Sequence, residues 1–253
     1  MLAEERQQVI LQYLRKKHVL KVNDFVRLLG ASESTVRRDL QELEEHGLLH
    51  RLHGGASLLD HRFQELDMEA KTEKNAVEKR RIARFAAQMI GEKECIFIDA
   101  GTTTFAMIPS LRDINVTVVT NSPIHARELS KADVDCYLIG GFLKRTTQAL
   151  VGSIASYNLL SFRFDRAFIG ANGVDIKMGF TTPDPEEATI KRQALEMASQ
   201  SYVLADNSKF SKVSFCKMFD LCQSAIITDR LPETMRSSYQ EGTTIYYAGD
   251  RDQ

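Results

Sequence analysis

The chain has 253 residues, 43% of them hydrophobic and 26% charged, with a formal net charge of −1. This balance predicts a folded protein of two domains and excludes a disordered chain, and no apolar run approaches the roughly 20 residues that a membrane helix needs. The first residues, MLAEERQQ, do not resemble a signal peptide, so we expect a cytoplasmic protein. The four cysteines form no Cys-x-x-Cys pair, and we therefore predict no metal site, no redox motif and no cofactor.

Two short helices are predicted before residue 31. Apolar residues recur near helical spacing at Val9, Ile10, Tyr13 and Leu14, and again at Val22, Phe25, Val26 and Leu29. Gly30 follows the second group and predicts the end of that helix, because glycine adopts the left-handed backbone conformation without strain.

A third helix is predicted to begin after Ser32, whose side chain can accept a hydrogen bond from a backbone N–H of the first turn. Its inner face is formed by Val36, Leu40 and Leu43. Its other faces carry polar side chains that stay available for DNA, namely Ser34, Arg37, Arg38 and Gln41. Residues 48–52 and the pair Gly54-Gly55 then predict a two-stranded wing, with Arg51 and His53 able to approach the DNA backbone. This arrangement is typical of proteins that place one end of a helix in the major groove.

The charge of this region leaves a second interpretation open. Residues 1–60 contain nine Lys or Arg and nine Asp or Glu, which gives a net charge of 0, whereas DNA-binding domains are usually basic. The segment could therefore be a small helical packing unit with solvated arginines. However, Glu42, Glu44 and Glu45 lie at the far end of the third helix, away from its arginines, and this separation favours DNA binding.

Residues 58–74 are polar and show no regular period. They predict a linker between a DNA-binding domain at residues 1–57 and a second domain at residues 75–253. Asn75 and Glu78 resemble a capping box and predict the start of a helix that ends at Gly91.

The second domain is predicted to be α/β, with a mainly parallel sheet. Seven short apolar runs alternate with helical segments, at residues 95–98, 116–119, 134–139, 167–169, 202–205, 225–227 and 244–247. Continuous β-branched and aromatic runs are typical of parallel strands covered by helices on both faces. Ligands bind such sheets beyond the carboxyl ends of the strands.

Small and polar residues follow five of these runs, and we expect them to converge on one pocket. They include Asp99, Gly101, Thr102, Thr103, Thr104, Asn121, Gly141, Gly170, Asn172, Asp206 and Lys209. The Gly-Thr-Thr-Thr start of a helix can hold a phosphate through backbone N–H groups and hydroxyls, although a plain helix cap needs only one Thr. Lys209 is the candidate cation for that phosphate, and Asp206 is the candidate acceptor for a sugar hydroxyl.

The segment SESTVRRDLQELEEHGLLHRLHGGA, residues 32–56, is similar to the signature of the DeoR family of bacterial repressors. The resemblance implies a winged helix-turn-helix domain that binds double-stranded operator DNA. It assigns operator contacts to Ser32, Ser34, Thr35, Arg37 and Arg38, and wing positions to Arg51 and His53.

The segments DAGTTT, TNS, IGG, FIGANGVD, TTPDPEEA and ADNSKF resemble the sensor domain of the same family. That domain is similar in fold to ribose-5-phosphate isomerase and glucosamine-6-phosphate deaminase, which implies a phosphorylated sugar as effector. Within the family, VTVVTNSPIHA, FDRAFIGANGVD and GFTTPDPEEA most resemble the fructose operon repressors of Gram-positive bacteria. We therefore expect a repressor that fructose 1-phosphate releases from a fructose operon, acting as a homo-oligomer, either a dimer or a tetramer, because operators present two half-sites.

The alternative is a sugar-phosphate isomerase or deaminase with an attached DNA-binding module. Ribose-5-phosphate isomerases carry an Asp-Gly-Ala-Asp-Glu stretch where this chain reads IGANG at residues 169–173, and Asn172 cannot take a proton. Glu186 or Glu187 is expected near the pocket, with Lys177 or Lys191. The glutamates are either effector ligands or an ordinary acidic first turn after Pro185. The loss of the acids favours binding over catalysis, so we expect no enzymatic activity.

Overall fold

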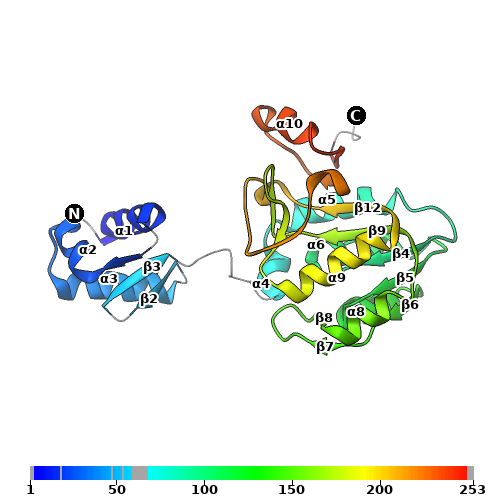
Figure 1. The fold of residues 1–253 in the computed structure, drawn as a ribbon, viewed down its shortest axis with the longest axis horizontal. Helices are drawn as coiled ribbons and strands as arrows, with labels where there is room; N and C mark the ends of the chain where they lie inside the picture. Colours follow the sequence, from blue (N-terminus) through cyan, green and yellow to red (C-terminus); the bar gives the residue numbers. More distant parts are fainter. Residues whose placement is uncertain (1–2, 18, 47, 53, 59–67, 250–253) are drawn as a thin grey trace. The chain divides into compact units, whose positions relative to one another are not determined.

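The computed structural model describes residues 3–17, 19–46, 48–52, 54–58 and 68–249, and the chain divides between residues 64 and 65 into two compact units (Figure 1). The first unit contains α1 (Ala3–Lys17), β1 (Val19–Lys21), α2 (Val22–Leu29), α3 (Glu33–Glu45), β2 (Leu49–Leu52) and β3 (Gly55–Leu58). Its strands form an antiparallel sheet in the order β1-β3-β2. The wing predicted from the sequence is therefore confirmed, and β1 adds a third strand.

Two glycines shape the first unit. Gly30 ends α2 in the left-handed conformation with φ 59°, and its N–H donates to the carbonyl of Val26, as predicted. Gly55 lies so close to β1 that a Cβ atom would stand 2.3 Å from the carbonyl oxygen of Leu20. Only glycine allows β1 and β3 to approach in this way.

The apolar stripes of the three helices meet in one core. Its fully buried members include Ile10, Leu14, Phe25, Val36, Leu40 and Leu43. Tyr13, which was expected in the same stripe, is about a third exposed because it lies at the margin of the helix face.

The second unit begins with α4 (Met68–Glu73) and α5 (Ala76–Ala87). A seven-stranded sheet follows, formed by β4 (Cys95–Ile98), β5 (Thr117–Thr120), β6 (Asp135–Leu138), β9 (Phe164–Gly170), β12 (Ala198–Leu204), β14 (Ala225–Thr228) and β15 (Ile245–Tyr247). Every pairing in it is parallel, in the order β15-β14-β12-β9-β4-β5-β6. Each of the seven predicted runs lies on one of these strands, so the predicted α/β class and parallel sheet are confirmed.

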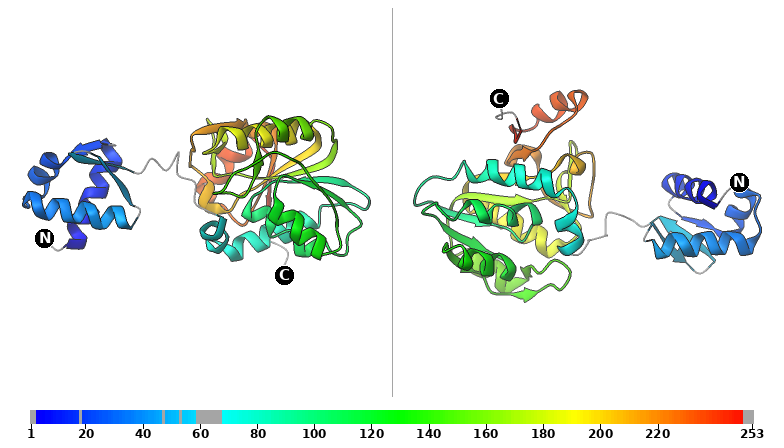
Figure 2. Two further views of the ribbon diagram at one scale, coloured as in Figure 1. Left: turned by 90° about the horizontal axis from the view of Figure 1, so that it is seen from below. Right: turned by 180° about the vertical axis from the view of Figure 1, so that it is seen from behind.

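Helices cover both faces of this sheet (Figures 1 and 2). Along β4, Ile96 and Ile98 pack with α5 and α7 (Pro123–Lys131). Phe97 points the other way and packs with α8 (Ser153–Leu159) and α9 (Pro185–Glu196). This alternation along one strand builds two buried layers, which is why the strand reads as a continuous apolar run.

The remaining elements are short. Two of them agree with the prediction: α6 (Thr102–Phe105) begins at the predicted helix start, and α10 (Glu233–Gln240) lies in a predicted helical segment. The others were not predicted, namely β7 (Phe142–Leu143), β8 (Leu150–Val151), β10 (Gly173–Asp175), β11 (Gly179–Thr182), β13 (Cys216–Phe219) and three single 3₁₀ turns at Ile108–Ser110, Asn207–Lys209 and Leu221–Gln223. β7 pairs with β8, and β10, β11 and β13 form a separate antiparallel sheet.

Two details around residue 75 differ from expectation. Residues 68–73, which were expected to belong to a linker, form α4. Asn75 precedes α5 with φ 54° and makes no side-chain cap, because its amide donates instead to Asp206 and Ser208. Among the described residues, no helix combines the length and apolarity needed to cross a membrane.

Candidate functional site

The start of α3 has the geometry of a capped recognition helix. Ser32 has extended backbone angles, and its hydroxyl oxygen accepts the backbone N–H of Thr35 at 3.2 Å. The same hydroxyl lies within hydrogen-bond distance of the hydroxyls of Ser34 and Thr35. Ser32 therefore has a structural role at this helix end as well as its predicted position toward DNA.

Arg37 and Arg38 project from the outer face of α3, with 49% and 82% of their side chains exposed. Each is paired within the helix, Arg37 with Glu33 at 2.6 Å and Arg38 with Glu42 at 3.0 Å. Exposed pairs four residues apart contribute only about 0.3–0.5 kcal/mol, so a phosphate or a base edge can displace the glutamates.

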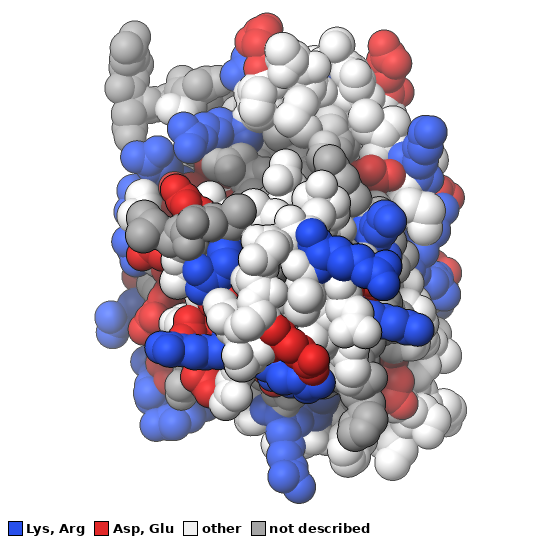
Figure 3. Space-filling model, turned by 90° about the vertical axis from the view of Figure 1, so that its left-hand side faces the viewer, with Lys and Arg blue, Asp and Glu red and all other residues white. Residues whose placement is uncertain are grey.

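The wing arginine lies against the helix instead of extending away from it. The guanidinium of Arg51 donates to the backbone carbonyl of Arg37 at 3.2 Å, and its backbone N–H donates to Glu44. His53, the other predicted wing contact, lies outside the described residues. On the face shown in Figure 3, basic and acidic side chains are interspersed, so positive charge alone does not mark a DNA-binding surface.

An ion pair on the opposite face of α3 was not predicted. Asp39 is almost fully buried and accepts two hydrogen bonds from the guanidinium of Arg6, at 2.7 and 3.0 Å. This ion pair fixes α1 against α3. A signal existed in the sequence, since Asp39 precedes Leu40 and follows Val36 by three positions, on the inner side of the helix.

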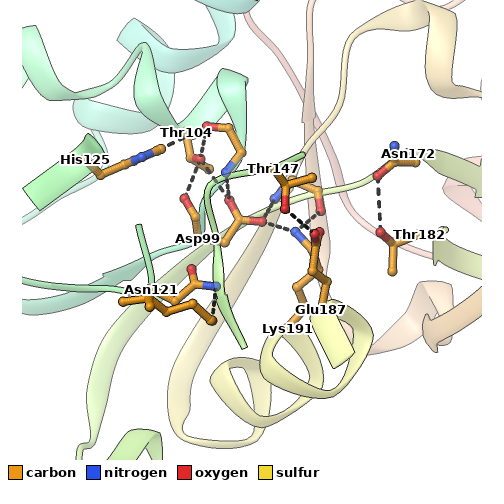
Figure 4. Close-up of polar contacts among 12 residues, drawn as sticks. Asp99, Thr104, Asn121, His125, Thr147, Asn172, Thr182, Glu187 and Lys191 are labelled. Carbon is orange, nitrogen blue, oxygen red and sulfur yellow. Dashed lines mark hydrogen bonds and ion pairs between the residues drawn. The ribbon is translucent and has the colours of Figure 1, made fainter. Parts of the chain in front are cut away.

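In the second unit some of the predicted pocket residues, Asp99, Gly101, Thr104 and Gly170, meet at the carboxyl ends of β4 and β9, where Figure 4 labels Asp99 and Thr104. Asn121 follows β5 instead, and Asp206 and Lys209 follow β12. β4 and β9 are neighbours, but the chain proceeds from β4 toward β5 and from β9 toward β12, so this is the point where the strand order reverses. Open parallel sheets bind ligands at such a point.

Asp99 lies at the centre of this region, and its carboxylate forms an ion pair and hydrogen bonds with other groups of the protein. It is buried, forms an ion pair with Lys191, and accepts the backbone N–H of Gly170 at 2.7 Å and of Gly101 at 3.1 Å. The hydroxyl of Thr104 donates to it at 2.8 Å. Burial alone would raise the pKa of Asp99, but the Lys191 ammonium and these hydrogen bonds hold that pKa below its ordinary value.

His125 supports the same loop from α7. Burial lowers the pKa of His125 to about 4, so its ring is neutral at physiological pH. A carbonyl can only accept, so Nε2 carries the proton and donates to the carbonyl of Gly101 at 3.1 Å, while Nδ1 accepts from the hydroxyl of Ser122 at 2.7 Å. His125 was not predicted as a site residue, because it reaches Gly101 only in the folded chain.

The three threonines after Gly101 have different surroundings. Thr104 directs its hydroxyl inward to Asp99, and Thr103 is buried. Thr102 accepts a hydrogen bond at 2.9 Å from Lys79, a residue of α5 that was not predicted to belong to the site. Thr102 is therefore the hydroxyl of this group that lies beside a cation.

Lys79 belongs to a group of lysines around Asp206, which we call the lysine cluster: Lys71, Lys74, Lys79, Lys209 and Lys212. Lys79 is almost fully buried, and it also donates to the backbone carbonyl of Lys71. Burial, followed by repulsion from Lys209, lowers the pKa of Lys79 to about 8. Burial and the neighbouring lysines likewise lower the pKa of Lys209, against the attraction of Asp206.

Asp206 is the carboxylate whose charge favours the protonated forms of Lys79 and Lys209. Its Oδ1 accepts the backbone N–H of Ser208 at 3.0 Å and the amide of Asn75 at 2.8 Å. Its Oδ2 is buried and has no hydrogen-bond partner among the described residues. The cluster therefore holds more positive than negative charge and contains a buried acceptor that a ligand hydroxyl would satisfy.

The other predicted pocket residues are placed as follows. Asn121 is buried and donates to the carbonyl of Leu150, while its Oδ1 has no partner among the described residues. Asn172 accepts from Thr182 at 3.3 Å. Gly141 has φ 147°, and a Cβ there would stand 2.8 Å from that of Ala155, so close packing against α8 explains this glycine.

Of the two glutamates at the start of α9, Glu186 is exposed and Glu187 is buried. Glu187 accepts from the hydroxyl of Thr147 at 2.7 Å and from Lys144 at 3.2 Å, and Lys144 also pairs with Asp184 at 2.7 Å. Asp184 caps α9 through the N–H groups of both glutamates. The β7–β8 loop is thereby fixed to the start of α9. Within the described parts of the chain, no three His, Cys, Asp or Glu side chains are arranged to hold a metal ion.

Both units match known domains. Residues 6–62 match the DeoR-like helix-turn-helix domain, and residues 74–230 match the DeoR C-terminal sensor domain. The chain is 42% identical, over 97% of its length and 98% of the relative's, to FruR, an uncharacterized helix-turn-helix regulator of Bacillus subtilis. It is 34% identical, over 89% of its length and 91% of the relative's, to the lactose phosphotransferase system repressor of Staphylococcus aureus.

A solved structure of ribose 5-phosphate isomerase from Methanocaldococcus jannaschii is also similar to part of the chain. The two are 18% identical, with a TM-score of 0.42, over 55% of this chain and 56% of the isomerase.

Proposed function

This chain belongs to the DeoR family of transcriptional regulators, and we propose that it represses a sugar-utilisation operon and leaves its operator when a phosphorylated sugar binds the sensor unit. The observation that carries this proposal is the lysine cluster around Asp206. The pKa of Lys79 and the pKa of Lys209 are both lowered in the lysine cluster. The protonated forms of these side chains are therefore disfavoured unless an anion binds beside them. A phosphate supplies that negative charge and several acceptor oxygens.

The surroundings of the cluster suit a sugar attached to the phosphate. The Oδ2 of Asp206 can accept from a hydroxyl, and the Oδ1 of Asn121 is another buried acceptor, at the end of β5, with the ends of β9 and β4 between the two. An unphosphorylated sugar would satisfy these acceptors but leave the lysine charges unbalanced, so it should bind weakly.

Fructose 1-phosphate is the first candidate effector, and fructose 1,6-bisphosphate and other ketose phosphates follow. The resemblance of the segments at residues 116–126, 164–175 and 179–188 to fructose operon repressors supports this choice. A repressor named for the lactose phosphotransferase system among the relatives supports control of sugar genes more generally.

We propose binding without turnover. Aldose–ketose isomerisation needs a carboxylate that can accept a proton from carbon. Asp99 is committed to Lys191, Glu187 to Thr147 and Lys144, and Asn172 has no basic oxygen of this kind. The Oδ2 of Asp206 is assigned to a sugar hydroxyl, beside lysines that favour its charged form. Incubation with candidate sugar phosphates and a search for product tests this directly, and formation of an isomer would contradict it.

The test of the proposed function is a gel-shift titration with an operator that the protein itself selects from random duplex DNA. We expect fructose 1-phosphate to lower operator affinity by about 5–150-fold, the usual range of allosteric coupling, and free fructose to have little effect. Tighter DNA binding with the sugar phosphate would show that the direction is wrong.

Variants of the cluster sharpen the test. Lys209→Ala and Lys79→Met should bind the operator normally but lose the response to the sugar phosphate. Lys177→Met is the matched control, because Lys177 is an exposed lysine of the same unit in the β10–β11 turn. A normal response of both cluster variants to the sugar phosphate would show that the phosphate does not bind at the lysine cluster.

A further inference from the structure

Exposed apolar side chains gather at one edge of the sensor unit, over β6, the β7–β8 hairpin and α8. We call this area the β6–α8 surface. Its members are Tyr137, Leu138, Phe142, Leu143, Ile154, Tyr157 and Leu160. Phe142 and Tyr157 are 69% and 75% exposed, values that are unusual for large aromatic residues without a partner.

The elements that carry these side chains are neighbours in space. The rings of Tyr137 and Phe162 are 5.6 Å apart, which joins β6 to the segment after α8. The backbone N–H of Gly140 donates to the side chain of Asn158, and a Cβ on Gly140 would lie 3.7 Å from Ile154. β7 thus leaves the end of β6 beside α8, and Figure 1 shows β6, β7, β8 and α8 together at one end of the unit.

The size of the surface is that of an interface. Aromatic side chains carry roughly 150–250 Å² each, so the exposed parts of Tyr137, Phe142 and Tyr157 alone amount to about 300–500 Å². Four aliphatic side chains add to this. A stable protein interface covers about 800 Å² on each partner, whereas monomers rarely expose larger apolar patches than a few hundred Å².

The surface also carries little charge. Residues 136–143 and 149–162 contain no Asp, Glu, Lys or Arg, in a chain that is 26% charged, and the exposed charged residues of β6 and the β7–β8 hairpin are Asp135 at the start of β6 and Arg145 in the hairpin. One charge of each sign on these elements gives little net attraction to DNA or to an acidic or basic peptide. An apolar surface with equally little charge is the matching partner, and a second copy of the chain presents one by symmetry.

The unpaired backbone edge of β6 also favours a second copy of the chain as the partner. β6 ends the sheet, and no described strand pairs with its outer edge. The N–H of Ile139 donates inward to Thr120 on β5, so by alternation the backbone groups of Cys136 and Leu138 point outward. A second β6 edge, related by a two-fold axis, offers the complementary donors and acceptors.

We propose that the β6–α8 surface is where two copies of this chain associate about a two-fold axis. The contact is isologous, so Phe142 and Tyr157 of each copy meet the same surface of the other. The pairing requires neither DNA nor the sugar phosphate, and it can be tested without either.

Sedimentation equilibrium of the full chain between 0.1 and 100 µM tests the proposal, a range chosen as roughly that of micromolar association. We expect the wild type to self-associate and Phe142→Glu and Tyr157→Glu to raise the dissociation constant at least about tenfold, because each places like charges at the contact. Ile176→Glu is the control, since Ile176 is about half exposed in the β10–β11 turn. A monomeric wild type, or variants that associate as it does, would overturn the proposal.

Hydrogen exchange of the wild-type chain gives a second readout that needs no variant. The amides of Cys136 and Leu138 should exchange several-fold faster after dilution below the dissociation constant, while amides of the inner strand β9 should not change. Exchange at β6 that is independent of protein concentration would count against pairing at this edge.

Discussion

At the scale of single residues, the burial of Lys79 affects its charge and therefore its proposed binding of a phosphate. Its pKa of about 8 lies below the ordinary value, so it loses its proton as the pH rises through 8. Lys209, Lys71 and Lys74 oppose its charge, and Asp206 favours it. A bound phosphate would favour the charged form further.

We therefore expect the affinity for fructose 1-phosphate to fall as the pH rises from 7 to 9.5, where the phosphate itself no longer titrates. Calorimetry in two buffers at pH 8 should show proton uptake on binding. Lys79→Met should bind more weakly and lose this pH dependence around 8. An unchanged dependence in that variant would assign the titration to another group.

A second residue-scale prediction concerns Asp99. Asp99→Asn removes the carboxylate charge that pairs with the buried ammonium of Lys191, and breaking a buried pair in this way costs about 3–5 kcal/mol. Urea unfolding of the sensor unit at pH 7 measures this loss.

The pH dependence of the same pair has a definite sign. The folded pKa of Asp99 is lowered, so its stabilisation is present above the ordinary carboxyl pKa and is lost as the pH falls through the lowered value. Wild type and variant should therefore converge in strong acid. An Asp99→Asn protein as stable as wild type at pH 7 would show that the pair contributes little.

At the scale of elements, α3 separates folding from recognition on its two faces. Arg37→Ala or Arg38→Ala should weaken operator binding by about 1–3 kcal/mol if the arginine contacts a guanine. Stability should change little, because both arginines are exposed. The contrast on the same helix is Leu40→Ala, which should cost about 2–5 kcal/mol of stability because Leu40 is fully buried.

Fluorescence anisotropy with operator DNA and thermal denaturation distinguish the two faces. Unchanged DNA affinity in both arginine variants would exclude α3 as the recognition helix. Loss of stability in them equal to that of Leu40→Ala would show that their side chains belong to the core.

At the scale of the whole molecule, the two units have separate cores, one formed by α1–α3 and the wing and the other by the parallel sheet. We expect two calorimetric unfolding transitions. Fructose 1-phosphate at 100 times its Kd should stabilise the sensor transition by about 2.7 kcal/mol and leave the other nearly unchanged. A single transition, or equal shifts of both, would show that the units unfold as one.

The sequence by itself determined the features that depend on local periodicity. Apolar spacing and caps located α2 and α3, down to Gly30 and Ser32, and seven apolar runs located every strand of the parallel sheet. The resemblance to DeoR repressors extended this to function. Predicting these features requires no knowledge of distant contacts, because the periods of helices and strands appear in the spacing of residues that are close in sequence.

Tertiary structure alone decided which polar residues are available to a ligand. Asp99, Thr104 and Gly170 were predicted to hold the effector, and the fold brings them together, but largely to bind one another and Lys191. Asn75 was predicted to cap a helix, yet it contacts Asp206, 131 residues away. Lys79 enters the pocket because α5 packs beside α6. Such roles arise from pairs of residues distant in sequence, and the energetic balance between burial, charge and hydrogen bonding at each pair is set only when the chain has folded.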